Sequence, residues 1–405
     1  HADDCFCCAS SIRQIKLKYK RMKNYSLFHL VALTLLIAIL GGCNQQSSET
    51  IRFYVGSYAP ADQSGIYCCE LDISSGKIVK TKELKGIENP SFLALHPNKE
   101  MLYAVGETTV TSQNDEGTVW SIALDQIDGS MNIVNSVSSG GAHPCHLSLD
   151  KNSKYLLVAN YSGGNVSMIP VFENLRLGHP VGVHLHELKG GPGPVTNRQQ
   201  KAHAHSINIS QDNSIAYACD LGTDEVIAYR LNIEEEMMMP DIFASYTCEP
   251  GAGPRHLALS PDGMNAYLIN ELNSTMVTLK VDPSGKIYNT QTISTLPDDY
   301  NGENFCADVH VHPDGKYVYG SNRGHNSIVV FERAPSGSLS LIQHQKVSGD
   351  WPRNFAISPS GEYLIVANQR SDNIVVFRID QSTGELIETG EEFSLSKPVC
   401  IVFVS

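Results

Sequence analysis

Basic side chains are scarce along this 405-residue sequence. Lysine and arginine total 30, against 43 aspartate and glutamate residues, which gives a net charge of −13. Residues 1–43 hold six basic and two acidic side chains, so the remainder carries 24 basic and 41 acidic groups, a net charge of −17. A surface that binds the phosphate backbone of nucleic acid needs the opposite balance. We therefore expect no nucleic-acid partner.

Cysteine pairs with a recognisable spacing are also absent. Seven of the 11 cysteines follow Cys43, and they are scattered, without the short spacings of a metal site or the density of a disulfide framework. We expect most of these seven to be buried strand residues: Cys68, Cys69, Cys145, Cys219, Cys248, Cys306 and Cys400.

No confident membrane span is found near the N-terminus either. The apolar stretch 27–40 is shorter than the roughly 20 residues that a spanning helix needs. It follows the basic start Met22-Lys23 and ends in Leu40-Gly41-Gly42-Cys43, which is the pattern of an export signal. Leu-Gly-Gly-Cys also resembles the lipobox of bacterial lipoproteins, in which the cysteine is acylated and becomes the mature N-terminus. The alternative is an ordinary signal peptide with a chance cysteine.

These features divide the sequence into four parts. Residues 1–21 are an upstream extension, 22–43 a lipoprotein-type signal peptide, 44–50 a polar tether and 51–405 one large domain. Cys43 would carry the lipid, and this anchor would be the protein's only contact with a membrane. The domain would then lie outside the cytoplasm, on the periplasmic or cell-surface side of a bacterial membrane.

One short phrase recurs along the domain. A proline or small residue leads into alternating apolar positions, followed by a polar turn and a Tyr- or Leu-centred strand. Spacings of roughly 46 to 60 residues, with strand-length alternation inside each unit, are typical of a β-propeller blade and not of a helical solenoid. The sequence therefore predicts an all-β, seven-bladed propeller with four-stranded antiparallel blades. The seven copies begin at Pro90, Pro144, Ala204, Pro254, Cys306, Pro352 and Pro398.

The two ends of the domain are expected to share the last blade. The seventh copy stops after a single strand, whereas the strand-like runs Ile51–Gly56 and Gly65–Leu71 have no preceding copy of the phrase. Pairing of these runs with Cys400–Val404 would close the ring and remove two exposed sheet edges. Because a closed ring can act alone, we expect a monomer.

Structural repetition brings equivalent positions of the blades together around the central channel. Because adjacent strands run antiparallel, the start of each first strand and the end of each second strand face the same rim. One mouth should therefore collect a histidine, three arginines and two glutamates. Charged residues on a rim can simply form solvated ion pairs. The joint presence of a histidine, three arginines and two glutamates at one mouth instead favours a polar binding site. The first positions are Ser91, Cys145, His205, Arg255, Ala307, Arg353 and Val399, and the second are Glu107, Tyr161, Leu221, Glu271, Arg323 and Gln369.

An ordered set of segments carries a family resemblance. They are Gly191-Pro192-Gly193-Pro194, Arg198-Gln199, His203-Ala204-His205-Ser206, Pro250-Gly251-Ala252-Gly253-Pro254-Arg255-His256, Ile269-Asn270-Glu271-Leu272-Asn273-Ser274, Ala307-Asp308-Val309-His310-Val311-His312-Pro313-Asp314-Gly315 and Ser321-Asn322-Arg323. The set resembles the lactonase family of seven-bladed propellers, which includes propeller-type 6-phosphogluconolactonases and fungal carboxy-muconate cyclizing enzymes. The likeness covers nearly the whole chain after Ile51.

The resemblance implies a site that works without a metal or any other cofactor. In the cyclizing branch a histidine, two arginines and a glutamate are implicated, and His205, Arg255 and Glu271 match three of them as catalytic residues. Arg323 and Arg353 both remain open as the second arginine. These two are assigned to substrate binding, together with three further residues in the matching segments: Arg198, His203 and Asp308.

The expected reaction is the hydrolysis of a sugar lactone, 6-phosphogluconolactone or a related aldonolactone. It requires water, a base and positive charge for the developing oxyanion. Glu271 or His205 could supply the base and Arg255 the oxyanion contact, while Arg323 and Arg353 suit a phosphate or carboxylate. Nearby arginines would lower the pKa of Glu271, which favours binding over strong basicity. No Gly-x-Ser-x-Gly nucleophile elbow occurs, and none is required.

Histidine pairs offer a metal alternative. His203 with His205, and His310 with His312, have the i, i+2 spacing that places two side chains on one face of a strand. However, His312 aligns with turn residues of the other repeats, so we predict no metal site. A third pair, His184 with His186, lies in a long insertion and is expected to be solvated.

Two rival functions remain at this stage. The charged mouth could serve a non-catalytic surface lipoprotein that binds a ligand or a protein, or an enzyme that closes a lactone ring. The export signal strengthens the first rival, because 6-phosphogluconolactone belongs to cytoplasmic metabolism.

Overall fold

The computed structural model describes residues 49–109 and 115–404. The predicted upstream extension, the signal peptide with Cys43 and residues 44–48 of the tether lie outside the described residues. Within the described residues, no helix has the length and apolar character needed to span a bilayer.

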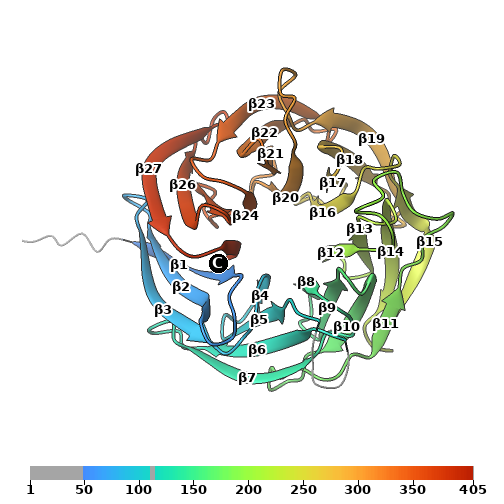
Figure 1. Cartoon of the computed structure of the whole chain (residues 1–405), viewed down its shortest axis with the longest axis horizontal. Coiled ribbons are helices and arrows are strands. Elements are labelled where there is room, and N and C mark those ends of the chain that lie inside the picture. The colour runs from blue at the N-terminus through green and yellow to red at the C-terminus, as the bar shows by residue number, and fades with distance from the viewer. Residues whose placement is uncertain (1–48, 110–114, 405) are drawn as a thin grey trace, which may run out of the picture. The chain divides into compact units, whose positions relative to one another are not determined.

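Seven four-stranded antiparallel sheets form the blades of a propeller, and no α-helix occurs in the described part of the chain (Figure 1). This confirms the predicted fold class. From the axis outward, the blade shared by both ends contains β28 (Pro398–Phe403), β1 (Thr50–Ser57), β2 (Ser64–Asp72) and β3 (Ile78–Lys85). The next blade contains β4 (Leu93–Leu95), β5 (Met101–Gly106), β6 (Thr118–Leu124) and β7 (Met131–Ser138).

The remaining blades follow the same order around the ring. The third contains β8 (Pro144–Leu149), β9 (Tyr155–Asn160), β10 (Asn165–Pro170) and β11 (Gly182–Leu185), and the fourth contains β12 (Ala204–Ile209), β13 (Ile215–Asp220), β14 (Glu225–Asn232) and β15 (Met237–Thr247). The fifth contains β16 (Pro254–Leu259), β17 (Asn265–Asn270), β18 (Thr275–Val281) and β19 (Ile287–Ser294). The sixth contains β20 (Phe305–Val311), β21 (Tyr317–Arg323), β22 (Ser327–Arg333) and β23 (Leu339–Lys346), and the seventh β24 (Pro352–Ile357), β25 (Tyr363–Asn368), β26 (Asn373–Ile379) and β27 (Leu386–Ser394).

The shared blade closes the ring as predicted. β28 pairs with β1 in antiparallel register, with Tyr54 opposite Val402 and Val55 opposite Ile401. The rings of Phe53 and Phe403 pack 5.4 Å apart across this pair. Both ends of the domain are thereby held in one sheet, in which β1 is paired along both of its edges.

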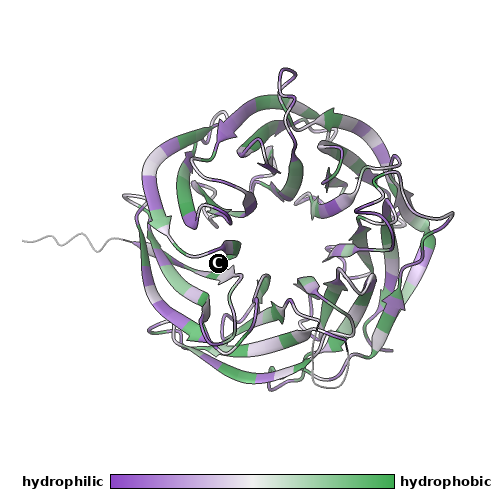
Figure 2. Cartoon of the chain, viewed as in Figure 1, coloured by the Kyte–Doolittle hydropathy of each residue, from purple (hydrophilic) through white to green (hydrophobic). Residues whose placement is uncertain are grey.

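Each blade packs its faces against the neighbouring blades, and this packing forms the core. The second strand of a blade is buried on both faces, as in β9, β13 and β25, whereas the outermost strands alternate with solvent. Figure 2 shows the hydrophobic residues along the strands and the more hydrophilic loops. The seven cysteines among the described residues are all buried and unpaired.

A tyrosine of the second strand ties several of the blades to the next one. The buried Tyr217 donates its hydroxyl to the carbonyl of Gly285 at 2.7 Å, and Tyr319 donates to Gly384 at 2.9 Å. Tyr267 makes the equivalent bond to Gly337, and Tyr363, which stands two residues earlier in its strand, donates to the carbonyl of Ile73. This explains the tyrosine at the centre of the repeated phrase, because a buried phenol needs a hydrogen-bond partner.

Several innermost strands are irregular at their first residues, next to the axial channel. Their pairing register shifts between Pro144 and His146, Ala204 and Ser206, Pro254 and His256, and Pro352 and Asn354. A β-bulge of this kind re-aims side chains next to a site. Two successive residues can therefore face the axis where strict alternation would allow only one.

Candidate active site

A cavity of about 600 Å³ lies at one end of the axis, and we call it the upper cavity. It is formed where the first strands begin and the second strands end, which is the mouth that the repeat predicts. Four arginines and three glutamates line it, in a domain whose overall charge is strongly negative. Its lining residues are Tyr58, Glu107, Cys145, Tyr161, Arg198, His205, Glu271, Glu303, Phe305, Arg323, Trp351, Arg353, Gln369 and Arg370.

Glu271 is the centre of the charged cluster. It follows the last residue of β17, is buried, and meets three guanidinium groups. Oε1 lies 2.6 Å from Nη2 of Arg198, while Oε2 lies 2.8 Å from Nη2 of Arg323 and 3.0 Å from Nε of Arg255. Burial alone would raise the pKa of Glu271, but the three arginines outweigh it and lower the pKa to about 2. Glu271 is therefore a permanent anion at neutral pH.

Arg255 lies beneath the cavity and not on its wall. It sits on β16 with only 2% of its surface exposed, and it donates to the backbone carbonyl of Ala307. Burial and the nearby charges of Arg323 and Arg353 lower the pKa of Arg255 to about 9, with Glu271 opposing them. The group remains a cation at neutral pH. Such a buried cation is tolerable because Glu271 pairs with it.

A second group of arginines lies on the wall without a carboxylate contact. Nη2 of Arg353 donates to the hydroxyl of Tyr58 at 2.9 Å, and that hydroxyl donates to Glu107 at 2.8 Å. Arg370 stacks on the indole of Trp351, with its guanidinium carbon 3.3 Å from the ring centroid. Among the described residues, neither Arg353 nor Arg370 forms an ion pair. Their charge is thus available to a ligand.

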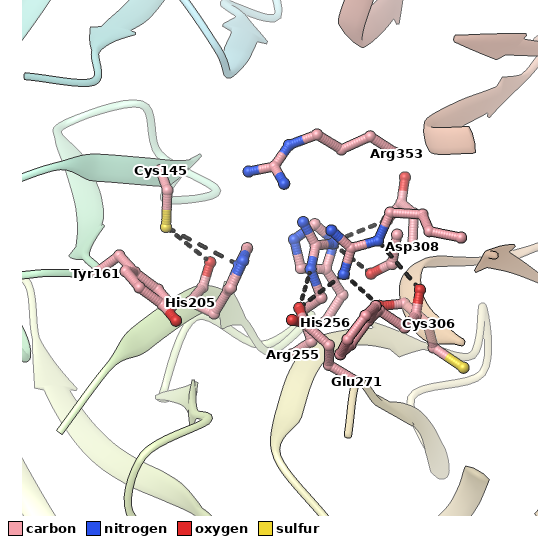
Figure 3. A network of polar contacts seen from close by, with 12 residues as sticks. Cys145, Tyr161, His205, Arg255, His256, Glu271, Cys306, Asp308 and Arg353 are labelled. Carbon is pink, nitrogen blue, oxygen red and sulfur yellow. Dashed lines mark hydrogen bonds and ion pairs between the residues drawn. The ribbon is translucent and has the colours of Figure 1, made fainter. Parts of the chain in front are cut away.

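His205 faces the cavity as a neutral imidazole. Burial lowers its pKa well below the usual value, and the charges of Arg255, His256, Arg353 and Arg323 lower it further. Its Nδ1 lies 3.9 Å from Sγ of Cys145, and no described residue makes a hydrogen bond to its Nε2. Nε2 is therefore free for a bound molecule. Figure 3 shows Arg255 and Glu271 of the fifth blade close to His205 of the fourth blade and Arg353 of the seventh.

Two residues expected at this site lie elsewhere. His203 stacks on Tyr161 at 4.4 Å between ring centroids, and its Nδ1 is 3.0 Å from the carbonyl oxygen of Tyr161, so it supports the wall from behind. Asp308 faces the far end of the axis, where it contacts His256 and His310. The structure thus gathers His205, Glu271, Arg198, Arg323 and Arg353 at the upper cavity, with Arg255 beneath it.

The histidine pairs have separate partners. His312 contacts Asp314 at 2.7 Å within its turn and the carbonyl of Gly361 at 3.0 Å, as its alignment with turn residues predicts. Among the described residues, no cluster of three or more His, Cys, Asp or Glu side chains could hold a metal ion.

The prediction that His186 is solvated is wrong. This residue follows the outer strand β11 and is buried. Its Nδ1 lies 2.7 Å from Asp220 and its Nε2 lies 2.8 Å from the hydroxyl of Tyr229. The buried Asp220 carboxylate needs this partner, which draws the start of the insertion into the neighbouring blade.

Sequence reasoning assigned no role to Tyr58, Trp351 and Arg370. Tyr58 follows β1 and Trp351 precedes Pro352, so both lie outside the two aligned positions. Arg370 stands one residue after Gln369, an aligned position, and an extension of that ring by one residue would have found it. Glu107 was part of the aligned ring but received no role beyond its charge.

The fold and the site define a seven-bladed propeller with an arginine-rich axial cavity. The family model described as "Lactonase, 7-bladed beta-propeller" matches residues 52–403, and the chain belongs to this family. It is 33% identical over 353 residues to a 6-phosphogluconolactonase of Bacillus subtilis, covering 87% of this chain and 97% of the relative. It is 36% identical over 349 residues to a 6-phosphogluconolactonase of Formosa agariphila, covering 84% of this chain and 95% of that one.

A solved structure shares the whole architecture. The periplasmic gluconolactonase of Pseudomonas aeruginosa superimposes with a TM-score of 0.82 at 31% identity, covering 88% of this chain and 99% of that one. The resemblance read from the sequence is thus confirmed.

Proposed function

We propose that this protein hydrolyses 6-phosphogluconolactone or a related aldonolactone in the upper cavity, without a metal. As a member of the lactonase family it is a carboxylic-ester hydrolase. The observation that carries the proposal is the concentration of Arg198, Arg323, Arg353 and Arg370 around one cavity of an otherwise acidic domain. Positive charge of this density suits an anionic sugar derivative and the oxyanion formed from its carbonyl.

The cavity has two electrostatically different sides. Around Glu271 the charges of Arg198, Arg255 and Arg323 are partly compensated, which suits a neutral lactone ring whose carbonyl gains charge only in the transition state. On the other side Arg353 and Arg370 have no carboxylate partner among the described residues. We assign the lactone carbonyl to the first side and a phosphate or carboxylate of the substrate to the second.

Glu271 serves this site as a counter-ion. With a pKa of about 2 and three arginines on its two oxygens, it is a poor proton acceptor. An imidazole is the better acceptor, because a neutral nitrogen with a free lone pair can take a proton from water. Burial and the charge of Arg255 hold the pKa of His205 well below its usual value, so His205 serves this site as a neutral hydrogen-bonding group for the substrate.

We also propose that the protein is exported and anchored through Cys43 as a monomer. The sequence pattern Leu40-Gly41-Gly42-Cys43 supports it, and a periplasmic relative of the same family, the gluconolactonase of Pseudomonas aeruginosa, gives a precedent for a lactone substrate outside the cytoplasm. Membrane fractionation of cells expressing the parent and Cys43→Ser chains tests it. The parent should partition with membranes and the variant should not.

A direct assay tests the proposed activity. Purified protein is mixed with 6-phosphoglucono-δ-lactone and, separately, with glucono-δ-lactone, and the rate is compared with spontaneous hydrolysis, with and without EDTA. We expect acceleration of at least one substrate that EDTA does not change. Tight binding of 6-phosphogluconate without any acceleration would instead support a binding protein, and loss of the rate in EDTA would show that a metal is needed.

The binding alternative rests on one specific observation. Both oxygens of Glu271 are occupied by arginines, so the most acidic group of the cavity is not free to act as a base. A ligand-binding protein or a ring-closing enzyme of the same family would also use such a cluster, and the assay run in both directions separates the three.

A further inference from the structure

Along the axis of the propeller, described residues line an upper cavity, a narrow space below it and a lower cavity, and these share walls. Below the upper cavity lies a small space of about 10 Å³, which we call the waist, and below that lies a lower cavity of about 700 Å³. Cys145 and Arg353 belong to both the upper cavity and the waist. Phe92, His256 and Asn354 belong to both the waist and the lower cavity. A polar space of this size holds about one water molecule.

A buried Asp–His pair faces the waist from below. Oδ1 of Asp308 lies 2.7 Å from Nδ1 of His256, and both residues are more than nine-tenths buried. The remaining capacity of Asp308 is used by the backbone N–H of Val309, by His310 at 3.0 Å and by the amide of Asn354. Asp308 accepts hydrogen bonds only, so Nδ1 of His256 carries the proton and Nε2 presents a lone pair.

Nε2 of His256 has no hydrogen-bond partner among the described residues, although its ring lines both the waist and the lower cavity. Burial and the Arg255 charge lower the pKa of His256 to about 4, against the opposing effect of Asp308. The ring is therefore neutral at pH 7 and able to accept a proton.

The neighbouring imidazoles are less suited to this task. The ring of His146 lies 5.4 Å from that of His256, but its Nδ1 accepts the backbone N–H of Ile207 at 3.3 Å, so its Nε2 carries a proton and cannot accept one. The ring of His205 lies 5.3 Å from His256, and its Nδ1 faces only the thiol of Cys145. Among these three imidazoles, His256 alone has a free acceptor nitrogen and a carboxylate that would stabilise its protonated form.

The waist also contains an unsatisfied polar group. The hydroxyl of Ser91 is buried and has no hydrogen-bond partner, and it lines the waist together with His256, Arg255 and Arg353. Buried hydroxyls are nearly always satisfied by protein or ordered water. A single water between Ser91 and Nε2 of His256 would satisfy both and would reach the floor of the upper cavity.

We propose that His256, oriented by Asp308, is the proton acceptor for the hydrolytic water, acting through one water held in the waist. The inference rests on the proposed lactone hydrolysis. As the attacking water bonds to the lactone carbonyl carbon, one of its protons passes to the waist water, which gives one of its own protons to Nε2 of His256. When the carbon–oxygen bond of the ring breaks, the proton returns by the same route to the leaving oxygen, which becomes a hydroxyl.

The protons and bonds balance over this cycle. The water oxygen ends in the product carboxyl group, and the carboxyl proton is released to solvent as the acid ionises. His256 and the waist water return to their starting states. Asp308 is a positioning residue throughout, because it holds the imidazole and compensates its transient charge while remaining ionised.

The titratable and charged groups facing His256 are few. Among the described residues they are Arg255 next to it in sequence, Asp308 with its second partner His310, the rings of His146 and His205, and Arg353 and Cys145, which line the waist with it. Because Asp308 raises the pKa of His256, loss of its charge should move the acid limb of the rate profile to lower pH. A purely structural role of the pair would not shift this limb.

Four variants test the inference with 6-phosphoglucono-δ-lactone as the probe. His256→Asn should lower kcat by about 100-fold or more with KM changed less than about threefold, while the matched control His146→Asn stays within about threefold of the parent. Asp308→Asn should lower kcat and shift the acid limb. Ser91→Val, which leaves the Asp–His pair intact and fills the waist, should lower kcat by about tenfold or more.

Binding of 6-phosphogluconate to each variant reports whether the upper cavity is still formed. His256→Asn and Ser91→Val proteins that bind this product and turn over the lactone as fast as the parent would overturn the inference and leave the proposed function standing. If the His256→Asn variant fails to fold, the rate of the Ser91→Val variant alone decides whether the inference stands. A parent protein without turnover would overturn the proposed function, and this inference with it.

Discussion

Arg198 reaches Glu271 from a different kind of structural element than the other two arginines do. Its Nη2 lies 2.6 Å from Oε1, and it comes from the segment between β11 and β12, whereas Arg255 and Arg323 come from strands and share Oε2. Its side chain is 28% exposed, against 2% for Arg255. Of the three arginines on Glu271, Arg198 is therefore the most accessible to a ligand in the upper cavity, and it can exchange Glu271 for a substrate oxygen at the least structural cost.

Replacement of Arg198 should weaken substrate binding more than stability. We expect Arg198→Gln to lower kcat/KM for 6-phosphoglucono-δ-lactone by roughly 10- to 100-fold, the value of one charge-assisted hydrogen bond. Lys201→Gln, in the same segment, removes an exposed charge that donates a hydrogen bond to the carbonyl of Ser162, and it serves as the control. Equal kinetics for the two variants would contradict a role for Arg198 at the site.

Arg353 and Arg370 should determine selectivity for a charged substrate. Removing either cation as Arg353→Met or Arg370→Met should raise KM for the phosphorylated lactone by roughly tenfold or more and leave that for glucono-δ-lactone within about threefold, because only the former has an anionic group to lose. The ratio of the two kcat/KM values measures this. A uniform loss with both substrates would place these arginines outside the anion site.

The pKa of Glu271 predicts a stability loss in acid. A carboxyl whose folded pKa is about 2 stabilises the folded state above its unfolded pKa, near 4.5, and this stability is lost as the pH falls from about 4.5 toward 2. Thermal unfolding followed between pH 7 and pH 3 should show it. Glu271→Gln should be less stable than the parent at pH 7 and should lose less on acidification, and identical pH profiles would exclude this assignment.

The hydrogen bonds of the second-strand tyrosines should contribute measurably to the free energy of unfolding. Tyr319→Phe removes the buried hydrogen bond to Gly384 and leaves that carbonyl without the partner, so it should lower the free energy of unfolding by about 1 to 3 kcal/mol. Tyr288→Phe, at an exposed position on β19, should change it by less than about 0.5 kcal/mol. Chemical denaturation of both proteins measures the difference.

The sequence predicted the ring of blades far better than it predicted how deep along the axis each side chain lies. Seven copies of one phrase predict the blades, and aligned positions such as His205, Arg323 and Arg353 do meet at one mouth, because a repeated fold places equivalent residues around one axis. Strict alternation of side chains along a strand would point only one of Arg255 and His256 toward the axis. The bulge in β16 brings both to the axis, at different depths. A register shift between Cys306 and Val309 affects β20 in the same way, and Asp308 lines the lower cavity instead of the predicted mouth.

Residues outside the repeat could not be predicted in the same way. Tyr58 and Trp351 lie outside the aligned positions, and no spacing relates them to the other blades. His186 depends on a carboxylate, Asp220, that lies 34 residues further along the chain. Long-range contacts of this kind come from the packing of neighbouring blades and leave no local signal in the sequence.

The central claim is that the lactone is hydrolysed at the charged cluster of the upper cavity. The measurement that tests it is the initial rate of 6-phosphoglucono-δ-lactone hydrolysis, corrected for the spontaneous rate, by the parent and by Arg323→Ala and Glu271→Gln proteins that remain folded. We predict clear acceleration by the parent and a loss of at least about 100-fold in kcat/KM in both variants. Variants that hydrolyse the lactone as fast as the parent would contradict it.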